Sequence, residues 1–156
     1  MPQFIQVLPG MRTLKTALAV FICIGIWRIW NDSMPFFAGI AAVITMQNSI
    51  ENSVKVGIDR FIGTLVGAFV GGLLVWTLPI NSITISLGII LVIHLTTIIK
   101  KGGSAAIASI VFLAITINIG DKSINNYIFM RVVETTLGIG IAVLINTLIK
   151  PPKKSM

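Results

Sequence analysis

The sequence has little charge. Only 11% of its 156 residues are Asp, Glu, Lys or Arg, whereas a disordered chain combines high charge with low hydrophobicity. Apolar residues make up 55% before the 14 glycines are counted, and soluble domains hold roughly 45–50% apolar residues with glycine included. The composition therefore excludes disorder and a soluble fold, and it predicts an all-α integral membrane protein.

Cysteine is nearly absent, and so are the sequence motifs of enzymes. Cys23 is the only cysteine, which leaves no disulfide and no Cys-x-x-Cys metal framework. The sequence has no phosphate-binding loop with lysine, no His-x-x-x-His or His-Glu pair, no Gly-x-Ser-x-Gly elbow and no paired aspartates suited to a metal. We therefore expect neither catalysis nor a metal or cofactor.

The basic residues are scattered between apolar runs, which argues against a nucleic-acid-binding surface despite a net charge of +7. With the N-terminus in the cytoplasm, nine basic residues fall on the cytoplasmic side and three on the other. This asymmetry predicts that both termini are cytoplasmic. The nine are Arg12, Lys15, Lys55, Arg60, Lys100, Lys101, Lys150, Lys153 and Lys154, and the three are Arg28, Lys122 and Arg131.

Six apolar runs follow one another, at residues 16–30, 35–50, 60–78, 83–99, 104–119 and 124 or 127 to 149. Six membrane-spanning helices need about 120 residues, which leaves no room for an extramembrane domain. We therefore expect a single transmembrane domain over 1–156, with a first three-helix half at 1–80, a second half at 81–150 and a short basic cytoplasmic tail at 151–156. The second run is short for a full span, so its helix is expected to continue through Glu51.

A short internal repeat links the two halves. The motif Arg-x-x-Gly-Thr-x-x-Gly at residues 60–67 recurs 71 residues later as Arg-x-x-Glu-Thr-x-x-Gly at residues 131–138. Each repeat unit then contains three helices, and an odd number of spans makes successive units insert in opposite directions, as in many secondary transporters. The pattern predicts two inverted three-helix repeats.

Small residues recur every fourth position from both motifs. Gly63, Gly67 and Gly71 form one smooth ridge, and Gly138 and Ala142 repeat it in the second half. A ridge without side chains lets another helix approach its backbone closely. The pattern predicts helix packing, either as a fixed contact, as a sliding contact that permits alternating access, or as a surface that binds partner helices.

Each repeat motif begins with an arginine, expected at the water boundary, one turn before a threonine. An arginine in this position anchors its helix by snorkelling, or it binds an anion, because the planar guanidinium matches a carboxylate bidentately. The second interpretation makes Arg60 and Thr64, together with Arg131 and Thr135, candidate substrate-binding residues.

Glu134 lies three residues after Arg131, so the two side chains share one helix face and can neutralise each other inside the bilayer. The pair is either a static structural ion pair, or Glu134 exchanges a proton as substrate moves. Glu51 is a second candidate for proton coupling.

A dense run of polar residues begins at Thr45, after the apolar stretch of the second helix. Short polar side chains at a helix end cap the helix or turn the chain. If the helix continues instead, Thr45, Asn48 and Asn52 share one of its faces. Gln47 and Glu51 share another, so that a polar cavity wall forms near the inner membrane face. Gln47 and Asn48 are therefore further candidate substrate-binding residues.

Five motifs carry a resemblance to a known family: Arg-x-x-Lys-Thr-Ala at 12–17, Pro-Phe-Phe-Ala-x-Ile-Ala-Ala-Val at 35–43, Thr-Met-Gln at 45–47, and the two repeat motifs. By their order and spacing, residues 9–149 resemble the membrane domain of the aromatic acid exporter family, within the wider group of fusaric-acid-resistance-like membrane proteins. The resemblance implies a bacterial inner-membrane protein that exports aromatic carboxylic acids or related amphipathic anions, driven by the proton gradient.

Two functions compete at this point. The first is an exporter whose partners are the lipid bilayer and a small aromatic or amphipathic carboxylate; the second is a non-transporting membrane scaffold or assembly subunit that packs through its glycine ridges. Polar groups facing a shared cavity favour the first, and polar groups all neutralised in helix contacts favour the second. Relatives in the family commonly continue into a soluble region, so this chain is a minimal version, a truncation, or one that forms a homo-oligomer to build its pathway.

Overall fold

The computed structural model describes residues 10–30, 35–117 and 123–149. Regular structure in these residues consists of α1 (Met11–Trp30), α2 (Phe36–Thr45), α3 (Ile50–Thr77), α4 (Ser82–Ile98), the short 3-10 helix η2 (Gly102–Ser104), α5 (Ala105–Ile117) and α6 (Ile124–Leu148). The prediction of an all-α chain with six helices is confirmed. The tail expected at 151–156 lies outside the described residues.

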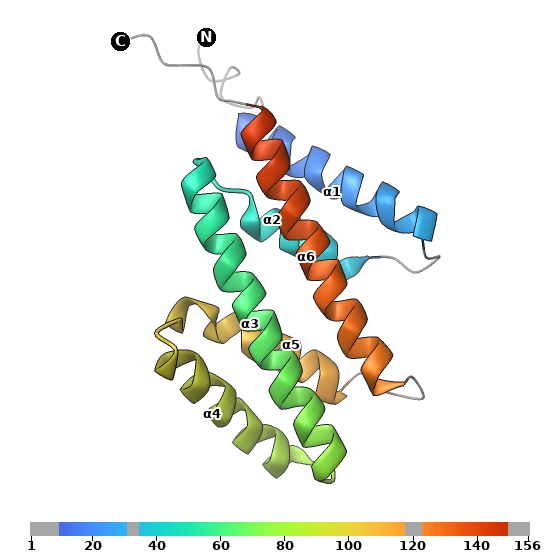
Figure 1. Ribbon diagram of the computed structural model, residues 1–156, viewed down its shortest axis with the longest axis vertical. Coiled ribbons are helices and arrows are strands. Elements are labelled where there is room, and N and C mark those ends of the chain that lie inside the picture. The colour runs from blue at the N-terminus through green and yellow to red at the C-terminus, as the bar shows by residue number, and fades with distance from the viewer. Residues whose placement is uncertain (1–9, 31–34, 118–122, 150–156) are drawn as a thin grey trace, which may run out of the picture.

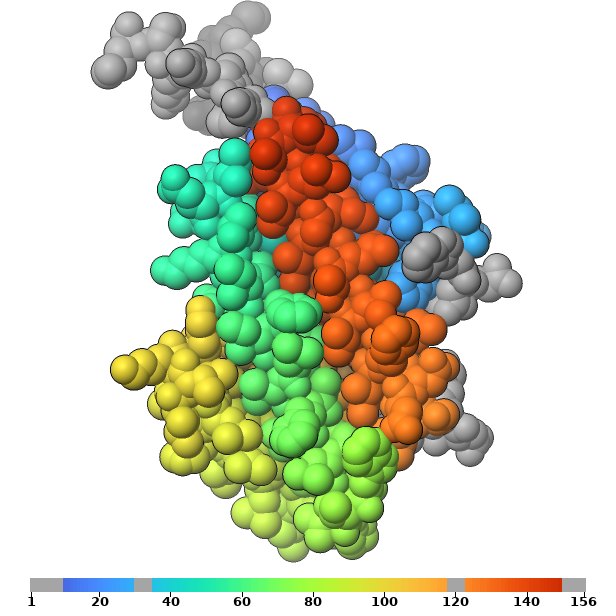
Figure 2. Space-filling model, viewed as in Figure 1, coloured from blue at the N-terminus to red at the C-terminus, as the bar shows by residue number. Residues whose placement is uncertain are grey.

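The long helices α3 and α6 run antiparallel through the centre of the bundle (Figure 1). α5 packs along α3 and α2 packs along α6, while α4 contacts α5 and α3, and α1 contacts α2 and α6. The space-filling view shows α6 seated between α1 and α3 (Figure 2). Each long helix therefore packs against the short helix of the other half of the chain.

The outer surface of the bundle is strongly apolar. α3 and α6 are long and apolar enough to cross a membrane, and α2, α4 and α5 are shorter apolar helices. Large side chains such as Phe21, Phe69 and Ile83 are 74%, 70% and 72% exposed. Such a surface is unfavourable in water and suits contact with lipid. That all six helices cross the membrane stays a prediction.

α2 ends at Thr45 and α3 begins at Ile50, so the expectation that one helix continues through Glu51 is wrong. Ser49 starts α3 instead, because its hydroxyl accepts a hydrogen bond from the backbone N–H of Asn52 at 3.2 Å. A serine side chain that satisfies a free backbone donor favours a helix start over a helix interior. Asn48 lies in the connection, so it does not share a helix face with Thr45 and Asn52.

Arg60 and Arg131 do not open their helices, contrary to expectation. α3 begins ten residues before Arg60, and α6 begins seven residues before Arg131. Ser53, Gly57 and Arg60 form one buried stripe along the first turns of α3, and most residues between them face outward. This helical spacing extends α3 through residues 51–59, which lie between two of the predicted apolar runs. Both arginines therefore lie well inside their helices.

Glycines of both repeat motifs make the closest helix contacts. A Cβ atom at Gly67 would collide with the Ala108 carbonyl oxygen of α5, and one at Gly138 would collide with the Ala38 carbonyl oxygen of α2. Only a residue without a side chain permits this approach of backbone to backbone. The other ridge residues are buried in the same two contacts, Gly63 and Gly71 against α5 and Ala142 against α2.

Candidate functional site

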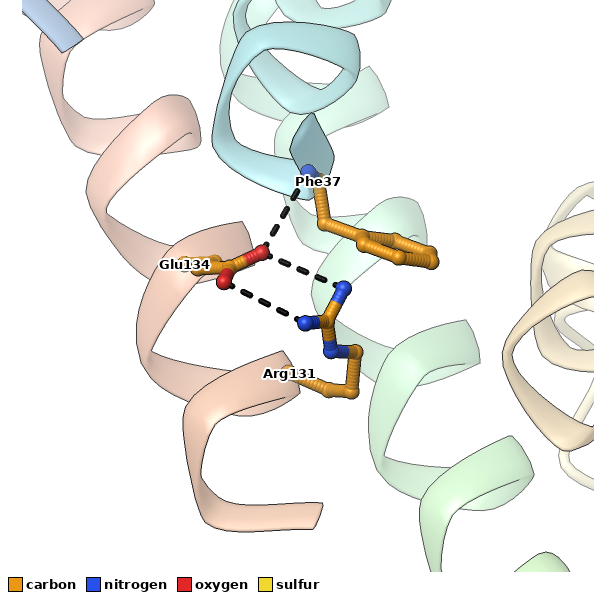
Figure 3. Close-up of polar contacts among 3 residues, drawn as sticks. All are labelled: Phe37, Arg131 and Glu134. Carbon is orange, nitrogen blue, oxygen red and sulfur yellow. Dashed lines mark hydrogen bonds and ion pairs between the residues drawn. The ribbon is translucent and has the colours of Figure 1, made fainter. Parts of the chain in front are cut away.

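Arg131 and Glu134 form an ion pair inside the bundle. Arg131 Nη2 donates a hydrogen bond to Glu134 Oε1, and Nη1 lies beside Oε2, both at 3.3 Å (Figure 3). The Glu134 side chain is 3% exposed and the Arg131 side chain 15%. This is the planar, bidentate geometry in which a guanidinium recognises a carboxylate. It also provides the buried carboxylate with a counter-ion, without which burial of the charge is strongly unfavourable.

Glu134 also ties α6 to the start of α2. Its Oε2 accepts a hydrogen bond from the backbone N–H of Phe37 at 3.3 Å (Figure 3). Phe37 lies in the first turn of α2, where backbone N–H groups have no partner within the helix and the helix dipole favours negative charge. Glu134 therefore caps α2 from another helix, and one carboxylate holds both α2 and Arg131.

Two aromatic rings flank the Arg131 guanidinium. Its Cζ lies 4.0 Å from the centre of the Phe37 ring and 4.6 Å from the centre of the Tyr127 ring. Both distances fall in the range of cation–π contacts. Neither ring was predicted from the sequence. Tyr127 precedes Arg131 by one helical turn, a usable signal, whereas Phe37 is 97 residues from Glu134 and only the tertiary fold brings it there.

Arg60 holds the equivalent place in the first repeat motif, but it has no carboxylate partner in the described part of the chain. The residue is 5% exposed, and its Nε has no hydrogen-bond partner. The neighbouring Asp59 carboxylate is bound to Lys101, whose Nζ lies 2.8 Å from Oδ1. The Thr64 hydroxyl donates to the Arg60 carbonyl oxygen at 3.0 Å, and Thr135, its counterpart in α6, is buried.

The remaining candidates, Gln47, Asn48 and Glu51, lie outside the site formed by Arg131 and Glu134. Gln47 accepts a hydrogen bond from Asn146 at its backbone oxygen, at 3.0 Å, and its side chain donates to the last turn of α2. Asn146 follows Arg131 by fifteen residues of α6, a rise of roughly 22 Å. Asn48 and Glu51 are exposed. The structure therefore separates these three candidates from the Arg131–Glu134 pair.

The two arginines lie nearer to each other. The register of α3 against α6 is set by contacts of Gly57 with Ile139 and of Gly72 with Ile128. In this antiparallel register Arg60 and Arg131 are separated by roughly 10 Å along the helix axes. Among the described residues, the interior thus holds two guanidinium groups, that of Arg131 with a carboxylate counter-ion and that of Arg60 without one. The described residues contain no group of three His, Cys, Asp or Glu side chains that could hold a metal ion.

Apolar helices around a buried ion pair are features of an integral membrane protein that keeps polar groups in its interior. Residues 8–149 match the family model described as aromatic acid exporter family member 1. The chain belongs to the aromatic acid exporter family, and the resemblance seen in the sequence is confirmed. Membership in this family supports a membrane location.

Bacterial UPF0421 proteins are relatives of this chain. The UPF0421 protein of Halalkalibacterium halodurans is 31% identical over 144 residues, which are 92% of this chain and 40% of the relative. Those of Oceanobacillus iheyensis and Bacillus subtilis are 28% and 27% identical, and the matches cover 92% of this chain and 41% and 40% of the relatives. The chain thus spans about two fifths of the length of these relatives. No solved structure matches it.

Proposed function

We propose that this protein exports aromatic carboxylic acids, or related amphipathic anions, across the inner membrane of a bacterium. The observation that carries the proposal is the Arg131–Glu134 fork flanked by two aromatic rings inside an apolar helix bundle. In this arrangement the Arg131 guanidinium binds a carboxylate at its edge and packs against aromatic rings on its faces. A carboxylate and an aromatic ring are the two chemical groups of an aromatic acid. Membership in the exporter family supports the same function.

The transporter we infer has six membrane-spanning helices in two inverted repeats, with both termini in the cytoplasm. The packing supports it, because α5 on α3 and α4 beside them match α2 on α6 and α1 beside them, as inverted three-helix units would. The start of α1 and the end of α6 lie at the same end of the bundle (Figure 1). Lys15, Arg60 and Arg131 lie inside the bundle and do not count as topology signals, but seven cytoplasmic basic residues still outnumber two outside.

Glu134 is the proposed proton-coupling residue. Protonation places one proton on a carboxylate oxygen and removes the negative charge, which weakens the ion pair with Arg131 and the hydrogen bond from the Phe37 N–H together. The first turn of α2 is then released from α6, and deprotonation restores both contacts. A proton that enters from outside and leaves to the cytoplasm would drive one release and recapture of α2 while a substrate anion moves outward.

The scaffold alternative has less support. It requires small-residue ridges that are free to bind partner helices, but Gly63 and Gly67 are covered by α5, and Gly138 is covered by α2. It also requires polar groups that are neutralised in helix contacts, and the buried Arg60 Nε is not. Both observations favour the exporter.

Flux measurements in proteoliposomes test the export proposal. Purified protein is reconstituted, and movement of radiolabelled benzoate is followed with and without an imposed proton gradient, with empty liposomes measuring passive leak. We expect the gradient to accelerate flux, Glu134→Gln to lose this response, and Glu51→Gln, which removes an exposed carboxylate, to keep it. Folded protein without benzoate flux above the leak would contradict the export proposal. A normal gradient response in Glu134→Gln would remove Glu134 from the coupling mechanism.

A further inference from the structure

The interior of the bundle contains buried polar side-chain atoms without a hydrogen-bond partner. Four buried side-chain atoms of the described residues have no hydrogen-bond partner, namely Thr45 Oγ1, Arg60 Nε, Ser104 Oγ and Arg131 Nε. Thr45 and Ser104 are fully buried, and Arg60 is 5% exposed. A buried polar atom without a partner is unfavourable, and a buried charge without a counter-ion is more so. Such groups therefore favour a ligand that completes their hydrogen bonds.

Thr45 and Ser104 both contact the stretch of α3 that carries Arg60. The Thr45 methyl group lies 3.3 Å from the Cβ position of Gly57, and the Ser104 carbonyl oxygen lies 2.8 Å from that of Gly63. Gly57, Arg60 and Gly63 are all buried residues of α3, each about 4.5 Å further along the axis. Thr45 at the end of α2 and Ser104 at the end of η2 therefore contact α3 one turn before and one turn after Arg60.

The comparison with Arg131 shows what this place lacks. Arg131 has Glu134 three residues later, whereas Arg60 has Gly63 at that position. The Ser104 carbonyl oxygen packs against Gly63, so α3 has no room for a carboxylate there. The first repeat thus holds a buried guanidinium that has no carboxylate partner among the described residues.

We propose that Arg60 binds one carboxylate group of the transported substrate, with the hydroxyls of Thr45 and Ser104 as further donors. The inference rests on the proposed export function and assigns its substrate site. The guanidinium would take both carboxylate oxygens as Arg131 takes those of Glu134, and each hydroxyl donates its hydrogen to a remaining lone pair. One positive charge without a counter-ion matches a monocarboxylate.

An apolar groove beside this site fits the rest of such a ligand. It lies between α3 and α6, has a volume of about 400 Å³, and is lined by Val54, Gly57, Ile58, Phe61, Thr136, Ile139, Gly140 and Val143. Gly57 lines the groove and lies on α3 one helical turn before Arg60. The lining suits an aromatic or aliphatic body and offers no partner for a second charge. The ligand class is therefore a monocarboxylate with an apolar body.

Binding of benzoate and benzamide to the purified full chain tests the site, because the two probes share a shape and differ in charge. By calorimetry we expect the wild type to prefer benzoate by about tenfold or more, the scale of a charge-assisted bidentate contact. Arg60→Gln should abolish this preference. Lys55→Gln removes one exposed charge from the same helix and should keep it. Thr45→Val and Ser104→Ala should weaken benzoate binding and leave benzamide binding unchanged.

Several results would overturn the assignment. The first is equal affinity of the wild type for the two probes, and the second is a preserved benzoate preference in Arg60→Gln. The third is competition of inorganic phosphate or phosphatidylglycerol nanodiscs with benzoate, which would assign Arg60 to a phosphate group. Arg60→Met addresses folding: without an internal partner, its ligand-free melting temperature should equal or exceed that of the wild type, and a large decrease would reveal such a partner. Binding is measured without flux, so wild-type benzoate flux that persists in Arg60→Gln refutes this site alone, and absent flux refutes the export function.

Discussion

Lys15 of α1 donates a hydrogen bond from Nζ to the Asn146 Oδ1 of α6 at 3.0 Å, across 131 residues of sequence. Both residues are buried, at 5% and 2% exposure. The Asn146 amide nitrogen donates onward to Ser53 Oγ at 2.8 Å and to the backbone oxygens of Gln47 and Ser49 at 3.0 and 3.2 Å. One amide group therefore joins α1, the connection between α2 and α3, α3 itself and α6.

Asn146→Leu should destabilise the protein strongly. The substitution preserves the size of the side chain but leaves the buried Lys15 ammonium without its acceptor and the connection without its donor, at an expected cost of about 2–4 kcal/mol. Denaturant unfolding in detergent measures the change. Thr147→Val is the matched control, because this exposed hydroxyl donates only to Val143 O of its own helix. Equal losses in the two variants would show that the buried amide has no special role.

Gly138→Ala and Gly140→Ala separate backbone contact from helix propensity. A Cβ at Gly138 would collide with Ala38 O of α2, whereas one at Gly140 meets nothing within 4 Å. Alanine in a helix interior is intrinsically more stable than glycine by roughly 0.5–1 kcal/mol. We expect Gly140→Ala to maintain or raise the melting temperature and Gly138→Ala to lower it. The forced separation of two helices in Gly138→Ala should decrease the free energy of unfolding by about 1–3 kcal/mol. A Gly138→Ala variant as stable as the control would contradict the close packing of α2 on α6.

Apolar periodicity and residue spacing predicted much of this architecture. The run at 83–99 places the fourth helix within one residue of α4 at each end, and the pairing of Arg131 with Glu134 follows from their separation of three residues. Such features depend only on neighbours along one helix. They can therefore be predicted before any packing is known.

Features that depend on contacts between distant segments were not predicted. Lys55 and Asp59 lie between two of the predicted apolar runs, although a buried stripe with an N-terminal serine cap extends α3 through them. The backbone N–H of Phe37 reaches Glu134 only because α2 packs on α6. The lack of a counter-ion for Arg60 depends on α5, whose first turn occupies the space at Gly63. Tertiary packing decides each of these.

Arg131→Lys should weaken transport although it preserves the charge. An ammonium group cannot donate two parallel bonds to Glu134 or lie flat against the rings of Phe37 and Tyr127, so we expect a decrease in benzoate flux of about tenfold. Arg28→Lys, an exposed arginine in the last turn of α1, controls for the general effect of the exchange. Equal flux in both variants, at equal amounts of folded protein, would show that the bidentate geometry is not needed for transport.

Labelling of single cysteines tests both the orientation and the span of α3. Cys23 is fully buried, so Cys23→Ala provides a background without thiols, into which Asn52→Cys or Ser82→Cys is introduced. These exposed positions flank the two ends of α3, whose 28 residues rise about 42 Å, more than the roughly 30 Å of a bilayer core. In intact cells an impermeant maleimide should label Ser82→Cys and not Asn52→Cys, and permeabilisation should expose both. The reverse pattern would show that the opposite topology is correct, with the excess of basic residues facing outward. Labelling of both positions in intact cells would show that α3 does not separate two compartments.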